Sequence, residues 1–120
     1  MLGDWGADVI KVESCRGDPV RVLGMNMLAP TDVEENPAFF VTNSNKRIIA
    51  LNQRMEEGKE IMRKLVGEAD VFITNFRKEA LVAMGLDYET LSQKQPRLVF
   101  AHILGFGEIG PGDVGCDSVE

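Results

Sequence analysis

Apolar residues in this chain gather in short blocks, and four of the blocks are predicted to be β-strands. They are rich in β-branched and aromatic residues and are bounded by polar or glycine-containing segments. The blocks are residues 8–13, 47–51, 70–75 and 98–103. The third is nearly continuous in apolar residues, which predicts a strand covered on both faces.

Helical spacing replaces the strand pattern between several of these blocks. From Met55 to Ala69 the apolar residues recur at helical intervals, and acids occupy the first turn, where the helix dipole favours them. A short helix is expected over 78–84, closed by Gly85. A further helix over 88–94 follows.

Local sequence signals predict both where the 88–94 helix begins and where it ends. Asp87 is a good N-cap, and Leu86 and Leu91 take the places of a hydrophobic staple. Pro96 prevents the helix from continuing.

The remaining segments carry weaker signals. Residues 19–46 show little periodicity and predict a long irregular excursion. Residues 1–7 are typical of the last turn of a helix, with Gly6 suited to the left-handed residue that closes it, and 117–120 are typical of a helix N-terminus. We therefore expect a fold that is incomplete at both ends. Trp5 and the methionines are interpreted as core or helix-packing residues.

Strands that alternate with helices predict an α/β fold with a Rossmann-like parallel sheet flanked by helices. Ligands of such sheets bind beyond the carboxyl ends of the strands. The loops expected there are 13–18, 51–54, 75–79 and 104–112. They offer cations, glycine amides and aromatic faces suited to an anionic nucleotide, from Arg16, Arg54, Arg77, Lys78, Gly105, Gly107, Gly110, Phe76 and Phe106.

Composition narrows the class of protein. A net charge of −6 and a pI near 4.8 argue against general binding to nucleic acid or anionic membrane. Cys15 and Cys116 are isolated, and no cluster has metal-ligand spacing, which favours a reducing compartment and no metal. With no signal-peptide pattern and no apolar run of membrane-spanning length, we expect a cytoplasmic protein.

The glycine loop matches a dinucleotide fingerprint, Gly105-x-Gly107-x-x-Gly110. That fingerprint requires a helix directly after it, to receive the pyrophosphate, but Pro111 and Gly112 follow here. A turn that lets backbone approach a ligand is favoured over an NAD site.

Three other polar features have two interpretations each. Lys46 and Arg47 could bind phosphate, but a turn with a solvated charge pair is favoured. His102, the one histidine, is expected to be a hydrogen-bonded core residue rather than a general base. Glu13 is expected to cap or anchor a loop rather than bind a ribose.

An ordered set of motifs covers nearly the whole chain. It comprises residues 2–13, Gly17-Asp18-Pro19, Asn43-x-Asn45-Lys46-Arg47, residues 68–77, Met84-Gly85-Leu86-Asp87-Tyr88, residues 96–99 and Gly105 to Pro111. This set resembles the family III coenzyme A transferases. The resemblance implies that residues 1–120 are part of a large, CoA-binding domain with a Rossmann-like fold. The rest of that domain and a smaller domain would lie outside this sequence, in a full-length interlocked homodimer.

The activity implied by the resemblance is transfer of CoA from an acyl-CoA donor to a carboxylic acid acceptor. An aspartate forms an acyl anhydride and then an aspartyl-CoA thioester, which splits one hard exchange into easier steps. That aspartate lies downstream of the glycine loop, so no catalytic residue can be named here. CoA and acyl-CoA are substrates, with no permanently bound cofactor. We expect residues 1–120 alone to be inactive and weakly stable.

The resemblance also implies which residues contact CoA. Segments matching the family's nucleotide-binding motifs contribute Val12, Leu51, Arg54, Asn75, Phe76 and Arg77. Two arginines found in some members are Ser14 and Ala83 here, so contacts to the adenosine phosphates are expected to differ. Arg16, Arg54 or Arg77 could substitute for them.

Two alternatives remain open at this point. One is an α-methylacyl-CoA racemase-like isomerase, which the resemblance associates with a histidine at position 116. Cys116 argues against it, because a thiol with an ordinary pKa of about 8.5 replaces imidazole poorly in acid–base catalysis. The other is a non-catalytic nucleotide-binding domain of the same fold.

Overall fold

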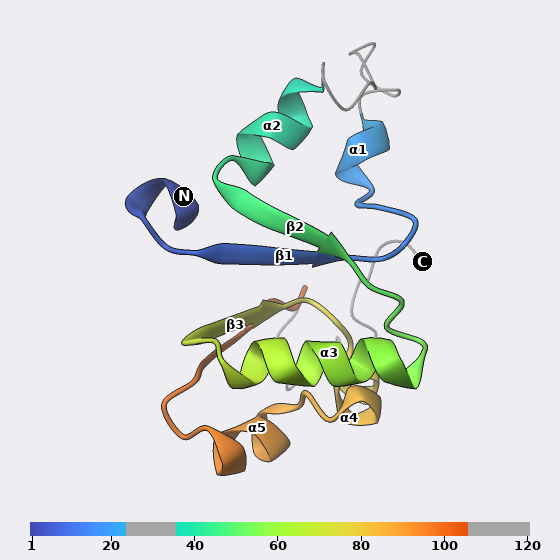
Figure 1. The fold of residues 1–120 in the computed structure, drawn as a ribbon, viewed down its shortest axis with the longest axis vertical. Helices are drawn as coiled ribbons and strands as arrows, with labels where there is room; N and C mark the ends of the chain where they lie inside the picture. Colours follow the sequence, from blue (N-terminus) through green and yellow to red (C-terminus); the bar gives the residue numbers. More distant parts are fainter. Residues whose placement is uncertain (24–35, 106–120) are drawn as a thin grey trace. The chain divides into compact units, whose positions relative to one another are not determined.

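The structure, a computed structural model, describes residues 1–23 and 36–105. It divides into two compact units, Met1–Gln53 and Arg54 onward, and each unit contains a two-stranded parallel sheet (Figure 1). The predicted α/β class and the parallel pairing of strands are confirmed within each unit.

The sheet of the first unit pairs β1 (Val9–Glu13) with β2 (Lys46–Ala50). The register runs from Val9 opposite Lys46 to Glu13 opposite Ala50, so both strands end at the same edge. A short 3₁₀ helix, η1 (Gly3–Trp5), precedes β1. It closes at Gly6 with φ 95°, the left-handed conformation expected from the sequence.

The prediction of an irregular excursion over 19–46 is wrong at both of its ends. Residues Val20–Leu23 form α1 and Pro37–Asn43 form α2, and the two helices contact each other. Asn36 explains why local periodicity misses them. Its fully buried side chain accepts from Phe39 N–H at 3.1 Å and donates to the carbonyls of Val20 and Arg21 at 3.1 and 3.0 Å. These helices are stabilised by contacts between segments distant in sequence.

The second unit contains three helices among its described residues. They are α3 (Glu56–Gly67), α4 (Lys78–Met84) and α5 (Tyr88–Lys94), as the sequence predicts. Its sheet pairs β3 (Val71–Thr74) with β4 (Val99–His102), in register from Val71 opposite Val99 to Thr74 opposite His102.

Local sequence signals account for the helix ends of the second unit. Gly85 closes α4 with φ 67°, and Asp87 caps α5 by accepting from Thr90 N–H at 2.9 Å. The staple residues Leu86 and Leu91 are both buried. They belong to an apolar core whose other members are Met62, Val66, Phe72, Leu81 and Met84.

Two expectations about burial are wrong, and a third is only partly right. The third strand is not covered on both faces, because Val71 and Ile73 are 45% and 50% exposed while Phe72 is buried. Trp5 is 77% exposed rather than in a core, since η1 is too short to pack its ring against a sheet. Met62 and Met84 are buried as expected, but Met1 and Met55 are exposed.

Candidate functional site

The carboxyl edge of the first sheet brings together two of the predicted CoA contacts. Val12 lies opposite Ile49 in the register, and Leu51 donates its N–H to the carbonyl of Glu13 at 2.9 Å. Val12 and Leu51 are both partly buried. Together they present aliphatic surface next to the ends of β1 and β2.

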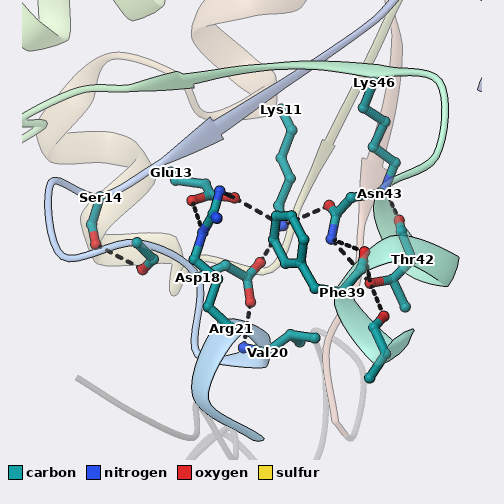
Figure 2. Close-up of polar contacts among 12 residues, drawn as sticks. Lys11, Glu13, Ser14, Asp18, Val20, Arg21, Phe39, Thr42, Asn43 and Lys46 are labelled. Atoms are coloured by element: carbon teal, nitrogen blue, oxygen red, sulfur yellow. Dashed lines mark hydrogen bonds and ion pairs between the residues drawn. The ribbon is translucent and has the colours of Figure 1, made fainter. Parts of the chain in front are cut away.

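Glu13 anchors this edge through a buried carboxylate. It is 6% exposed, and Arg21 of α1 donates to both of its oxygens, from Nε at 3.0 Å and from Nη2 at 3.3 Å (Figure 2). The Lys11 ammonium lies 3.3 Å from the same carboxylate. The interpretation of Glu13 as an anchoring residue is confirmed, because it ties β1 to the helix that follows.

Asp18 completes the ionic cluster around Lys11. The two side chains form an ion pair, and Asp18 Oδ1 accepts from Val20 N–H at 2.7 Å, at the start of α1. Partial burial acts to raise the pKa of Asp18, but the hydrogen bonds from Lys11 and Val20 outweigh it and hold that pKa below its usual value. Asp18 therefore remains ionised at neutral pH.

Phe39 of α2 supplies the apolar centre of the same cluster. The Arg21 guanidinium carbon lies 4.0 Å from the centroid of its ring, and Lys11 Nζ lies 5.3 Å away. Lys11 also donates to Asn43 Oδ1 at 2.8 Å. Figure 2 shows these side chains converging from β1, α1 and α2. Lys11 and Arg21 are thus engaged by protein groups.

The loop after β1 is a tight turn. Gly17 adopts φ 85°, and its N–H donates to the carbonyl of Ser14 at 2.9 Å. Ser14 Oγ accepts from Arg16 N–H and donates to the carbonyl of Gly17, each at 3.3 Å. Ser14 thus closes this turn, and Cys15 and Arg16 beside it are exposed.

The segment around Lys46 and Arg47 lies at the other end of the sheet. Lys46 donates to the carbonyl of Thr42 at 2.6 Å, and Arg47 donates to both oxygens of Asp8 at 2.9 and 2.5 Å. Asn45 forms the turn with φ 55°. The favoured interpretation, a turn with a solvated charge pair, is confirmed.

The turn between β3 and α4 brings together three more of the predicted contacts. Asn75, Phe76 and Arg77 are consecutive and exposed. Phe76 N–H donates to Thr74 Oγ1 at 3.2 Å, and Arg77 is the N-cap residue of α4. An amide, an aromatic ring and a guanidinium are therefore presented at the carboxyl edge of the second sheet.

Arg54 and Ala83 complete the positions highlighted by the sequence in this unit. Arg54 is exposed just before α3, and Ala83 is exposed on α4. The structure places Arg54, Asn75, Phe76 and Arg77 in the second unit and Val12 and Leu51 in the first. Gly107, Gly110, Phe106 and Cys116 lie outside the described residues, as does the segment 117–120.

His102 makes a contact that the sequence did not specify. Its Nε2 lies 2.7 Å from the main-chain oxygen of Phe76, so the expected hydrogen bond is present, but the side chain is only partly buried and not in a core. The partner could have been inferred only from the register that sets His102 opposite Thr74, two residues before Phe76.

We also searched the described residues for cavities, metal-ligand groups and membrane-spanning helices. A cavity of about 180 Å³ in the second unit is lined by both apolar or aromatic and charged side chains: Leu81, Tyr88, Phe100, His102, Asp87, and Lys78 and Glu89, which lie 3.9 Å apart. Within 1–23 and 36–105, no group of three or more His, Cys, Asp or Glu residues is arranged to hold a metal ion. None of the helices in those ranges has the length and apolar character needed to cross a membrane.

Comparison with known proteins decides the family. The sequence profile of CoA-transferase family III matches residues 1–117. The chain belongs to CoA-transferase family III. This family III chain is 49% identical over 111 residues to the (R)-2-hydroxy-4-methylpentanoate CoA-transferase of Clostridioides difficile, covering 92% of the chain and 28% of that protein.

Other members of family III show similar coverage. The chain is 50% identical over 111 residues to the cinnamoyl-CoA:phenyllactate CoA-transferase of Clostridium sporogenes, covering 92% of the chain and 27% of that relative. It is 43% identical over 114 residues to the succinate–glutarate CoA-transferase of Agrobacterium fabrum, covering 92% and 28%. The chain thus spans roughly a quarter of the length of these curated relatives.

Solved structures agree with the family III assignment. A CAIB/BAIF family protein from Brucella suis is 46% identical and superposes with a TM-score of 0.82, covering 93% of the chain and 30% of that structure. A hypothetical protein from Mycobacterium tuberculosis is 28% identical, with a TM-score of 0.78 and coverage of 93% and 29%.

Proposed function

We propose that this family III chain is the N-terminal part of the large domain of an enzyme that transfers CoA from an acyl-CoA donor to a carboxylic acid. The observation that carries the proposal is the family match over residues 1–117. Relatives at 43% to 50% identity, each named as a CoA-transferase, support it. The remainder of the large domain and a smaller domain would follow in the full-length protein, a cytoplasmic homodimer.

The proposed role of the described residues is to bind CoA. Each unit presents part of the set at the carboxyl edge of its sheet, where parallel α/β sheets bind their ligands. The exposed guanidinium groups of Arg54 and Arg77 suit phosphates, and the ring of Phe76 suits a base. Val12 and Leu51 offer aliphatic contact, and Asn75 offers a donor and an acceptor.

The chemical steps are assigned to an aspartate downstream of residue 120. Its carboxylate attacks the thioester carbonyl of the donor, and CoA thiolate leaves as an acyl anhydride forms. The thiolate then attacks the aspartyl carbonyl of that anhydride and releases the donor acid, which leaves an aspartyl-CoA thioester. The acceptor carboxylate then attacks the aspartyl-CoA thioester, which releases CoA thiolate and forms a second anhydride. The thiolate attacks the acceptor's acyl carbonyl in that anhydride, which releases the new acyl-CoA and regenerates the aspartate.

An assay of the full-length protein tests the activity. Acyl-CoA donors would be paired with the acids named in its relatives: 2-hydroxy-4-methylpentanoate, phenyllactate, succinate, glutarate and oxalate. We expect a new acyl-CoA to appear only when donor and acceptor are both present. Epimerisation of a 2-methylacyl-CoA without transfer would contradict the proposal.

The covalent intermediate provides a second test. The full-length protein, incubated with acyl-CoA and no acceptor, is expected to carry CoA on one aspartate, detectable by mass spectrometry of its peptides. Residues 1–120 treated in the same way are expected to carry no CoA, because the aspartate lies beyond them. CoA attached within residues 1–120 would show that the nucleophile is misassigned.

A further inference from the structure

His102 contacts the proposed CoA-binding turn, although the proposed function gives it no role. Its Nε2 is 2.7 Å from the carbonyl oxygen of Phe76. Because a carbonyl oxygen only accepts hydrogen bonds, Nε2 must carry a hydrogen and donate it. At this contact the ring is therefore a donor to the backbone and not a proton acceptor.

The backbone of Phe76 is hydrogen-bonded by two residues, Thr74 and His102, that pair with each other in the sheet. Its N–H donates to Thr74 Oγ1 at 3.2 Å, and its carbonyl accepts from His102. Thr74 and His102 are directly opposite each other at the end of the β3–β4 pair. Ile103 N–H donates to the carbonyl of Thr74 at 2.8 Å and extends the pairing by one bond. The sheet edge thus restrains the peptide groups before and after Phe76.

The helix that follows cannot provide this restraint. Arg77 is the N-cap of α4, and its carbonyl accepts from Leu81 N–H at 3.1 Å. The carbonyl of Phe76 precedes the cap, so it lies outside the hydrogen-bond ladder of the helix. Its orientation depends on His102.

The ring of His102 is itself oriented by packing. It contacts Phe100 edge to face, with centroids 6.0 Å apart. Phe100 in turn contacts Phe72 at 5.6 Å and Tyr88 at 5.8 Å, and Phe72 is buried. These aromatic rings link the donor on His102 to the core of the second unit.

We propose that His102 is a positioning residue for CoA binding, which fixes the Asn75-Phe76-Arg77 turn in the orientation that receives the nucleotide end of a CoA thioester. The inference rests on the proposed function, since it concerns the same turn. A turn held in its binding orientation loses less conformational entropy when the ligand binds, so the hydrogen bond contributes to affinity without contact with the ligand.

Steady-state kinetics of the full-length protein test this role. His102→Leu removes the donor, and we expect the KM for acyl-CoA to rise about three- to tenfold, the usual range for one hydrogen bond. We expect kcat at saturating acyl-CoA to stay within about twofold, because the proposal gives the ring no part in the chemical steps. His102→Gln should restore most of the lost affinity, since its amide can donate to the same carbonyl.

Tyr88→Leu is the matched packing control. It removes a ring from the same aromatic cluster but leaves the bond between His102 and Phe76. We expect it to lower Tm without raising the KM for acyl-CoA. If Tyr88→Leu raises that KM as much as His102→Leu does, or if His102→Gln restores nothing, packing explains the effect and the positioning role is wrong.

Thr74→Val covers the case in which His102→Leu does not fold. It removes the acceptor of the hydrogen bond from Phe76 N–H at nearly constant side-chain volume, and it should also raise the KM for acyl-CoA. An unchanged KM would overturn the proposal.

Arg77→Ala separates the hypothesis of a CoA site at this turn from the hypothesis that His102 positions the turn. If it raises the KM while His102→Leu does not, the CoA site stands and the positioning role fails. If the wild-type protein shows no saturable use of any acyl-CoA, both fail.

Discussion

The two units bury different kinds of side chain beside their sheets. Among the described residues, the first unit buries Glu13, Asn36 and Asn43 around the aromatic ring of Phe39. The second buries an apolar set, and its buried polar side chains, Thr74 and Asp87, are placed at a strand end and a helix cap. The first unit is organised by specific polar contacts, whereas the second is organised by hydrophobic packing and local caps.

Two glutamates, one in each unit, have the same kinds of ionic partner but differ in burial. Glu13 and Glu56 each pair with one arginine and one lysine, Glu13 with Arg21 and Lys11, and Glu56 with Arg63 and Lys59. The side chain of Glu13 is 5% exposed and that of Glu56 is 69% exposed. Because water screens the exposed cluster, the same ionic composition should stabilise the two units very differently.

Apolar truncation in the second unit should have the largest effect. Leu86 is fully buried, and Leu86→Ala leaves a cavity in the core. We expect the full-length protein to lose about 3 kcal/mol of unfolding free energy, measured by urea denaturation. Val82→Ala on the exposed face of α4 is the control and should change that free energy by less than about 0.5 kcal/mol. Equal losses in the two variants would refute the assigned core.

Neutralising the buried glutamate in the first unit should come next. Glu13→Gln removes the carboxylate that pairs with Arg21, which is partly buried, whereas Lys11 keeps its ion pair with Asp18. We expect a loss of about 2 kcal/mol, below the range for fully buried pairs because both cations remain partly exposed. Glu56→Gln is the matched control, and its urea midpoint should stay close to that of the wild type. If the two variants lose the same stability, burial is not what distinguishes the clusters.

A second comparison sharpens the interpretation of the Glu13 cluster. Removing both partners in Glu13→Leu/Arg21→Leu should lower the free energy of unfolding by less than the sum of the losses in Glu13→Leu and Arg21→Leu, because the double variant leaves neither charge without the other. Additive losses would mean that the two side chains act independently.

Loss of the Asp87 cap should have the smallest effect on stability. Asp87→Ala should cost about 1 kcal/mol, and Asp87→Asn less, since an amide oxygen can still accept from Thr90. Hydrogen bonds from the backbone N–H and hydroxyl of Thr90 hold the pKa of Asp87 below its usual value. The stabilisation from its charge is therefore complete above the ordinary carboxylate pKa of about 4 and declines as the pH falls below it. Urea midpoints of wild type and Asp87→Asn across that range should converge at low pH; a gap that widens on acidification would contradict this account.

The same difference explains how far the sequence predicts the fold. In the second unit, Gly85, Asp87 and Pro96 mark helix ends through interactions within a few residues, so the elements there are predicted closely. In the first unit, α1 and α2 depend on contacts such as that between Arg21 and Phe39, which no local pattern encodes. The prediction that Trp5 is buried is wrong because apolar character alone does not indicate a packing partner.

Prediction of the candidate site follows the same division. The motif residues Asn75, Phe76 and Arg77 could be named from the sequence, and the structure shows them together on one turn. The donor from His102 to Phe76 could not be named, because it depends on the register of β3 and β4, which are separated in the sequence by α4 and α5. Contacts between residues remote in sequence required the structure.

The most direct test of the account is the KM for acyl-CoA of full-length Arg77→Ala, measured beside Arg97→Ala. Both arginines are exposed, but Arg77 follows the carboxyl end of β3, whereas Arg97 precedes the amino end of β4. The account predicts that Arg77→Ala raises the KM for acyl-CoA about tenfold or more, because a charge-assisted hydrogen bond is lost, and changes kcat less. It predicts that Arg97→Ala has the same KM as the wild type. An unchanged KM in Arg77→Ala, or an equal rise in both variants, would contradict the assignment of CoA binding to this edge of the sheet.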